Sequence, residues 1–213
     1  MLNISIRSVV AISRRIMKTA VPALALGLLV ASPARADFSE GYKFLEAVKK
    51  KDGDKVEKAV MASSQIINSK DVTTGETALL IVTARRDLTW LTYLIAKGAN
   101  VNAGDDRGRT PLELAVNLGW REGATLLLEQ KASPDPSNDA GETPLIFAVH
   151  RKDANMMKAL LEAGANPDRA DNSGRSARDY AKIEGGGQNL GTTIDTYAKK
   201  NLKAAKPVYG PTF

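Results

Sequence analysis

The feature that most constrains this chain of 213 residues is a regular spacing of its glycines. Gly75, Gly108, Gly141 and Gly174 follow one another at intervals of 33 residues. Two residues after each glycine comes a hydroxyl side chain, in the order Thr77, Thr110, Thr143 and Ser176. A fixed period of this length is typical of repeats that stack on their neighbours around a continuous core. The sequence therefore predicts a stacked array of repeats.

Each repeat carries the signals of two helices. In Thr110-Pro111-Leu112 and the matching segment at Thr143, the threonine hydroxyl can cap a helix, and proline suits the first helical turn. The first helices should end near Arg85, Leu118 and Arg151. The second helices have apolar residues spaced to line one face, as in Leu91, Leu94 and Ile95 or Met156, Met157, Leu160 and Leu161. Gly98 and Gly164 follow these helices, where glycine adopts a left-handed backbone at little cost.

These segments resemble the ankyrin-repeat family, in the G-x-T-P-L start, the second-helix leucines and the G-A-N-x-[ND] end. The resemblance implies an all-α fold, an ankyrin-repeat solenoid of stacked helix-turn-helix units joined by hairpin-like tips. The predicted domain covers 37–201, with a cap at 39–71, repeats at 72–104, 105–137 and 138–170, a C-terminal cap at 171–201 and a flexible tail at 202–213. Trp90 is expected to pack in the core.

Several residues depart from the repeat pattern. Val72 stands where Asp105 and Asp171 provide a tip aspartate in other repeats, and Lys131 replaces the glycine at the end of its repeat. Arg178 occupies a position where a core leucine is expected. Because a terminal repeat needs a polar outer face, the change at Arg178 suits a cap.

The first 36 residues have the three parts of an export signal. Basic residues at 14, 15 and 18 precede an apolar run at 21–31, and Ala34-x-Ala36 fits a cleavage site before Asp37. We expect a signal peptide at 1–36, cleaved between Ala36 and Asp37, and a periplasmic or secreted protein of a bacterial type. Met1 and Met17 both remain possible starts. No stable membrane insertion is expected after cleavage, because the apolar run is shorter than the roughly 20 residues that span a bilayer.

Charge and composition exclude several classes of function. The net charge is +6, but residues 1–36 contain five basic and no acidic residues, which leaves only +1 on the remainder. This balance gives no support to nucleic-acid binding. With no cysteine and a single histidine, His150, the chain lacks the residues for disulfides, thiolate metal sites or multi-histidine metal sites. We expect no cofactor, no metal and a monomer.

The main prediction is a non-catalytic protein–protein interaction module that binds another protein through its concave surface, as the resemblance implies. Two roles stay open within this class, a helper of a periplasmic enzyme and an immunity protein that neutralises a toxin. The alternatives from other classes are a hydrolase that uses His150, with Asp153 nearby, and an envelope-associated protein held by the tail lysines 199, 200, 203 and 206.

The candidate protein-binding residues lie on the predicted tips and on the first helices with the turns that follow them. On the tips they are Thr73, Thr74, Glu76, Asp106, Arg107, Arg109, Asp139, Glu142, Asn172 and Arg175. On the first helices and turns they are Arg85, Asn117, Leu118, Trp120, His150 and Arg151. Trp120 either packs locally or stands exposed as a binding anchor. Arg107, Arg109, Glu142 and Arg151 are expected to lie close together, because stacking places equivalent positions side by side.

Overall fold

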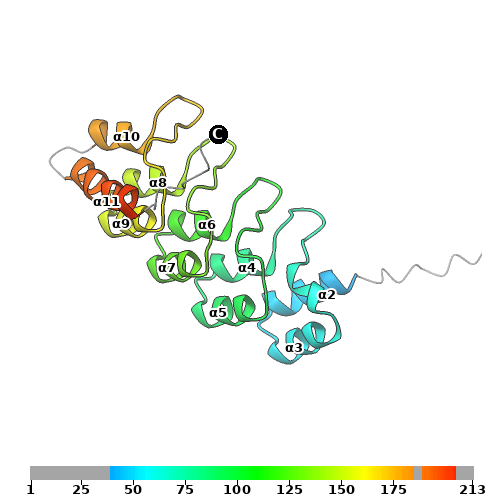
Figure 1. Ribbon diagram of the computed structural model, residues 1–213. Coiled ribbons are helices and arrows are strands. Elements are labelled where there is room, and N and C mark those ends of the chain that lie inside the picture. The colour runs from blue at the N-terminus through cyan, green and yellow to red at the C-terminus, as the bar shows by residue number, and fades with distance from the viewer. Residues whose placement is uncertain (1–38, 185–188, 205–213) are drawn as a thin grey trace, which may run out of the picture. The chain divides into compact units, whose positions relative to one another are not determined.

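The structure is a computed structural model that describes residues 39–184 and 189–204, with side chains to residue 198 (Figure 1). Its helices are α2 (Glu40–Lys49), α3 (Gly53–Ala62), the 3-10 helix η2 (Ser64–Asn68), α4 (Ala78–Ala84), α5 (Leu88–Ala96), α6 (Pro111–Asn117), α7 (Arg121–Glu129), α8 (Pro144–His150), α9 (Ala154–Glu162), α10 (Ala177–Glu184) and α11 (Leu190–Ala204). Within these residues no strand is present, apart from two isolated bridges, Lys70 with Thr77 and Ala170 with Ser176.

The starts of the first helices agree with the expected capping. The hydroxyl oxygens of Thr77, Thr110 and Thr143 accept hydrogen bonds from the backbone N–H three residues later, at 3.3–3.4 Å. Pro111 and Pro144 open their helices. These helices end one residue before Arg85, Leu118 and Arg151, which are their C-caps, so the ends lie near the positions that the sequence predicts. The expected capping and helix bounds are therefore confirmed.

The core lies between two rows of helices. First helices α2, α4, α6, α8 and α10 pack on one another in that order, and each second helix packs on its own first helix (Figure 1). Leu79, Leu112 and Leu145 repeat at one position of the first helices and are at most 2% exposed. Leu91, Leu94 and Leu127 face them from the second helices and are fully buried, whereas Trp90 is only partly buried. The all-α solenoid is thus confirmed.

The tip before α4 corrects the expectation that Val72 replaces an aspartate. Asp71 Oδ1 accepts hydrogen bonds from the N–H groups of Thr73 and Thr74, which is the role of Asp105 in the next tip. The Asp71 N–H donates to Glu76 O at 2.9 Å, just as Asp105 N–H donates to Arg109 O at 3.1 Å. The tip therefore contains one extra residue, and Val72, which is 93% exposed, is accommodated outside the packed structure.

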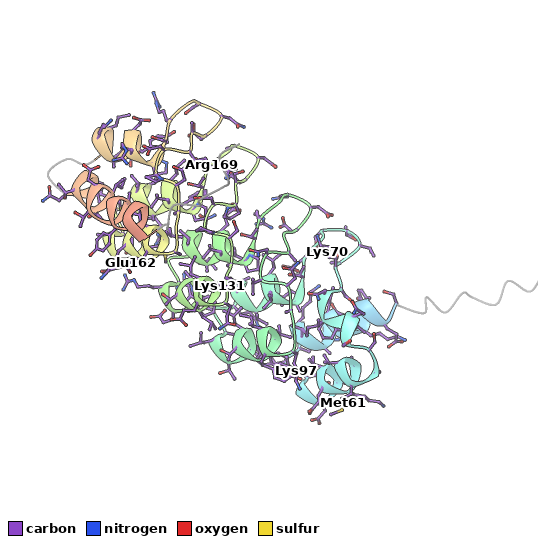
Figure 2. All side chains as sticks on the ribbon, viewed as in Figure 1. Met61, Lys70, Lys97, Lys131, Glu162 and Arg169 are labelled. Carbon is purple, nitrogen blue, oxygen red and sulfur yellow. The ribbon has the colours of Figure 1, made fainter. Side chains whose placement is uncertain are left out.

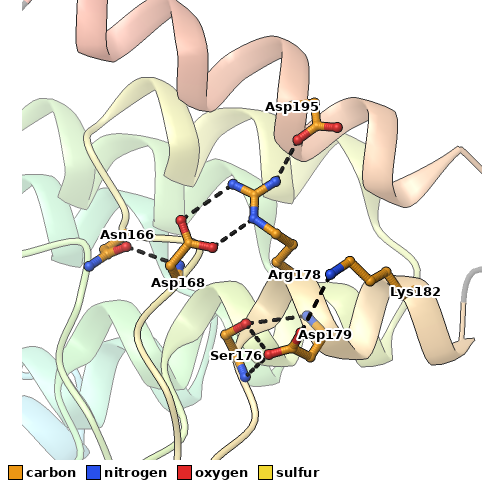
Figure 3. A network of polar contacts seen from close by, with 7 residues as sticks. All are labelled: Asn166, Asp168, Ser176, Arg178, Asp179, Lys182 and Asp195. Atoms are coloured by element: carbon orange, nitrogen blue, oxygen red, sulfur yellow. Dashed lines mark hydrogen bonds and ion pairs between the residues drawn. The ribbon is translucent and has the colours of Figure 1, made fainter.

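The C-terminal helix pair closes the described part of the stack with charge in place of a leucine. Arg178 occupies the position of Leu145 one repeat later, and its guanidinium donates to the carboxylates of Asp168 and Asp195 (Figure 3). Asp179 Oδ2 accepts from the Ser176 hydroxyl at 2.6 Å beside it. Arg178 can therefore stand in the place of a core leucine, because carboxylates of α11 and of the end of the preceding repeat neutralise its charge.

Several expectations concern residues outside those described. They are the signal segment 1–36 with its cleavage site at Ala36 and Asp37, the side chains of the tail lysines, and the tail beyond residue 204. Residues 202–204, which the sequence analysis assigned to the tail, belong to α11. Among the described helices, none has the length and apolar character needed to cross a membrane.

Candidate protein-binding surface

Each tip is a tight turn held by one side chain. An aspartate or asparagine at the start of each tip accepts hydrogen bonds on its Oδ1 from two backbone N–H groups later in the same tip, at 2.8–3.2 Å. The accepting residues are Asp71, Asp105, Asn138 and Asp171. Such local side-chain bonds are typical of Asx turns. Hydrogen bonds from Ser173 and Tyr180 hold the pKa of Asp171 well below its usual range, which favours its ionised form. The tips are therefore fixed by charged or amide groups that stay hydrogen-bonded.

Backbone hydrogen bonds also join the tips in two pairs. Asp106 N–H donates to Thr74 O at 3.2 Å, and Asn172 N–H donates to Ala140 O at 2.9 Å. The approach is so close that a Cβ atom on Gly75, which has a φ of +68°, would lie 2.2 Å from Asp106 Oδ1. Lys70 and Arg169 lie among these loops (Figure 2), and Lys70 Nζ donates to Gly104 O at 2.7 Å. The first tip is thus bonded to the second, and the third to the fourth.

The candidate residues differ in how freely they reach solvent. Those with exposed side chains are Thr73, Thr74, Asp106, Arg107, Arg109, Asp139, His150, Arg151, Asn172 and Arg175. Those that are partly buried are Glu76, Arg85, Asn117, Leu118 and Glu142. Arg109 braces its own tip through Asp105 at 2.6 Å, and Glu142 accepts from Asn138 at 3.0 Å. The exposed side chains of Asp106, Arg107 and Asp139 form no such bond with other described residues, so they are available to a partner.

Two candidate arginines hold the stack together. Arg85 Nη1 donates to the carbonyl oxygens of Val48 and Lys49, at 2.6 and 3.2 Å, at the end of α2. Arg151 Nη1 reaches Asn117 O at 3.4 Å at the end of α6. Both arginines therefore bind backbone carbonyls at the C-terminus of a neighbouring first helix, where positive charge is favoured. Sequence reasoning missed this structural role.

The expected cluster of Arg107, Arg109, Glu142 and Arg151 forms only in part. The charge of Arg109 lowers the pKa of Glu113 and the charge of Glu142 raises it, so both side chains lie near the start of α6. Arg151 lies at the opposite end of α6, beside Asn117. The one-repeat spacing correctly predicts neighbours along the stack, but it does not bring tip positions next to positions at the ends of the first helices.

Glu113 is a buried acid that the sequence analysis did not single out as functional. It is 1% exposed, and its Oε2 has no hydrogen-bond partner among the described residues. Burial raises the pKa of Glu113 to about 7. The Thr110 N–H and the charge of Arg109 favour the charged form and oppose this rise. Its equivalents in the neighbouring repeats, Leu80 and Ile146, are buried and apolar, which is the signal that could have identified it.

Among the described residues, His150 does not have the partner that the hydrolase alternative requires. Its Nδ1 lies 2.8 Å from Glu184 Oε1, and its ring meets Tyr180 edge-on with centroids 4.6 Å apart. Asp153 instead caps α9 by accepting the Met156 N–H at 3.0 Å, and it lies near Arg121. No described hydroxyl group forms a hydrogen bond with His150. The geometry gives His150 a bond between α8 and α10 rather than a nucleophile to activate.

Trp120 is a core residue, so the packing alternative is correct and its place among the binding residues is wrong. The side chain is 7% exposed and lies against Gly123, where a Cβ atom would be 2.2 Å from the indole ring. The missing side chain at Gly123 makes room for the ring, a pairing that the sequence shows only once the two residues are known to share a helical turn.

Groups of acidic or histidine side chains that could hold a metal ion are absent from the described residues.

Comparison with known families agrees with this architecture. A model of three ankyrin repeats matches residues 44–138, and a model of many ankyrin repeats matches residues 127–181. A search among curated proteins gives no match. Ankyrin repeats are generally protein–protein interaction modules, and proteins built from them are typically not enzymes. With 44–181 matched and the helix pairs stacked as described, this chain belongs to the ankyrin-repeat proteins.

Proposed function

We propose that this protein is exported to the bacterial periplasm and there binds a partner protein through its tips and first helices, without catalytic activity of its own. The observation that carries the proposal is the row of tips, each of which is fixed by an Asx turn and which are bonded to one another in two pairs. A surface that is ordered before binding loses less conformational entropy on association.

The exposed charges suggest the character of the partner. Asp106 and Asp139 alternate along the tips with Arg107 and Arg175, and all four are exposed. A surface with both signs of charge interspersed favours a protein patch of mixed charge over a polyanion, because complementary charges steer association and fix its register.

The test of this surface compares two charge reversals. The partner would first be captured by cross-linking the protein in periplasmic extract and then purified. Arg107→Glu should weaken its binding by about 1–2 kcal/mol, the scale of a true interface contact. Lys158→Glu, an equal charge change at an exposed position of α9, should leave the affinity unchanged. Arg109 is a poor choice because it also braces Asp105.

Titration calorimetry would measure both affinities, with circular dichroism as a check on folding. The proposal fails if Lys158→Glu loses binding while Arg107→Glu retains it. Export is tested separately by the intact mass of the protein from the cell that produces it. A mass that begins at Asp37 supports export, and a mass that retains residues 17–36 contradicts it.

A further inference from the structure

A crevice lies between two second helices, away from the tips and the first helices. It has a volume of about 300 Å³ and is lined by Gly53, Asp54, Glu57, Thr89, Trp90 and Tyr93. The first three come from the beginning of α3 and the others from the beginning of α5. These two helices are less closely packed than α9 and α11 are, which leaves room for the crevice.

One side of the crevice is aromatic. The rings of Trp90 and Tyr93 meet edge to face, with centroids 5.9 Å apart and an interplanar angle of 72°. Lys97, which follows the end of α5 (Figure 2), already places its Nζ 5.5 Å from the centre of the Tyr93 ring. Aromatic faces attract cations through their quadrupole. The aromatic side is therefore suited to a positively charged group.

The other side of the crevice carries negative charge that is not neutralised. Asp54 and Glu57 are exposed, and no ion pair within the described residues involves either of them. Lys55, which lies between them in the sequence, is bound to Asp52 at 2.6 Å. Two carboxylates beside an aromatic pair thus remain without a cation.

The Tyr93 hydroxyl adds a third kind of group. Its oxygen is buried and has no hydrogen-bond partner among the described residues. Burial and the nearby charge of Glu57 both raise the pKa of Tyr93, so the hydroxyl stays neutral and its oxygen can accept a hydrogen bond. A buried polar atom without a partner is costly, and a ligand N–H group would satisfy it.

We propose that this crevice binds the guanidinium group of an arginine side chain on a partner protein. A guanidinium is planar, so it can stack on an aromatic ring while its N–H groups reach carboxylates at its edge. The crevice offers the ring of Trp90, the carboxylates of Asp54 and Glu57, and the acceptor oxygen of Tyr93. The site lies on the second helices, so it is a contact in addition to the proposed tip surface, and its test needs no natural partner.

The test is a titration of the whole protein with Nα-acetyl-arginine amide, followed by nuclear magnetic resonance. The chain has two tryptophans, so the indole N–H signal of Trp90 can be assigned with Trp90→Phe and followed beside that of buried Trp120. The Trp90 signal should shift and saturate with a Kd of roughly 1 mM, the scale for a ligand of this size. The Trp120 signal should stay in place.

Two controls isolate the charge. Nα-acetyl-citrulline amide has the same length but a neutral end group, and it should bind at least about tenfold more weakly. Glu57→Gln should weaken the arginine compound about threefold, since the site is open to solvent. Glu122→Gln, an equal change in the neighbouring groove between α5 and α7, should have no effect.

Each result decides the proposal. It is overturned if Trp90 does not respond, if the citrulline compound binds as tightly as the arginine compound, or if Glu57→Gln behaves like Glu122→Gln. Equal binding of Nα-acetyl-lysine amide would also overturn the assignment of a guanidinium. A saturable shift at Trp90 that depends on both the ligand charge and Glu57 supports it.

Discussion

Replacing Glu113 by glutamine should stabilise the protein above neutral pH. The ordinary pKa of this side chain is 4.5, and burial raises it to about 7 in the folded protein. Between these values the folded state keeps a proton that the unfolded state releases, so the free energy of unfolding falls as the pH rises. Above pH ~7 the folded state contains a buried charged carboxylate, and the whole penalty is present.

The size of the effect follows from the two pKa values. One pKa unit is worth about 1.4 kcal/mol, so the rise from 4.5 to about 7 corresponds to about 3 kcal/mol at pH 8. Glutamine has nearly the same shape, remains neutral at every pH and keeps an oxygen that can accept the Thr110 N–H. The variant and the original protein should therefore have similar stability near pH 4.5 and should differ increasingly up to pH 8.

The assay is urea unfolding followed by circular dichroism, at several pH values from 4.5 to 8.5. Glu122→Gln serves as the control, because Glu122 is an exposed acid in the first turn of α7. Its effect on the free energy of unfolding should vary little over this range. The reasoning about Glu113 would be refuted if the stability difference between Glu113→Gln and the original protein were the same at pH 4.5 and pH 8.

Three further substitutions test the packing and the turns, each by urea melts. Lys131→Gly should stabilise the protein by roughly 0.5–1 kcal/mol, since Lys131 adopts a left-handed φ of +66°, and a clear loss would contradict this. Gly123→Ala should cost about 1–3 kcal/mol and shift the fluorescence of Trp120, because the new Cβ would meet the indole ring at 2.2 Å. Arg178→Leu should cost about 1 kcal/mol in low salt through loss of its two ion pairs, and an equal cost in high salt would argue against their role.

The periodic features of the fold could be predicted from the sequence because they depend on local rules. The threonine caps, the proline-opened helices and the left-handed backbone at Lys131 each follow from a residue and its immediate neighbours. The buried leucines follow from the helical period. The extra residue at Val72 was misread because a missing aspartate and an inserted residue look alike until Asp71 is seen to make the turn.

The roles of individual surface residues were harder to predict because they depend on contacts between repeats. Arg85 and Arg151 stand at positions that vary between repeats, as binding residues often do, yet both contact carbonyls of the preceding repeat. His150 is bound to Glu184, which is 34 residues away in the sequence. To predict such contacts one must know which helix ends meet, and the sequence pattern alone does not show this.

The division between bracing and free side chains has a consequence for how this surface can select a partner. Arg85 and Arg109 carry positive charge, but their hydrogen bonds maintain the stack and a tip, so their replacement would disturb the scaffold as well as any contact. Arg107, Asp106 and Asp139 are exposed on the same edge of tips without such a role. Charge at these three positions can change while the fold is kept, because the Asx turns depend on Asp105 and Asn138 instead. On the proposed binding surface, charge can therefore be altered at these three positions independently of stability.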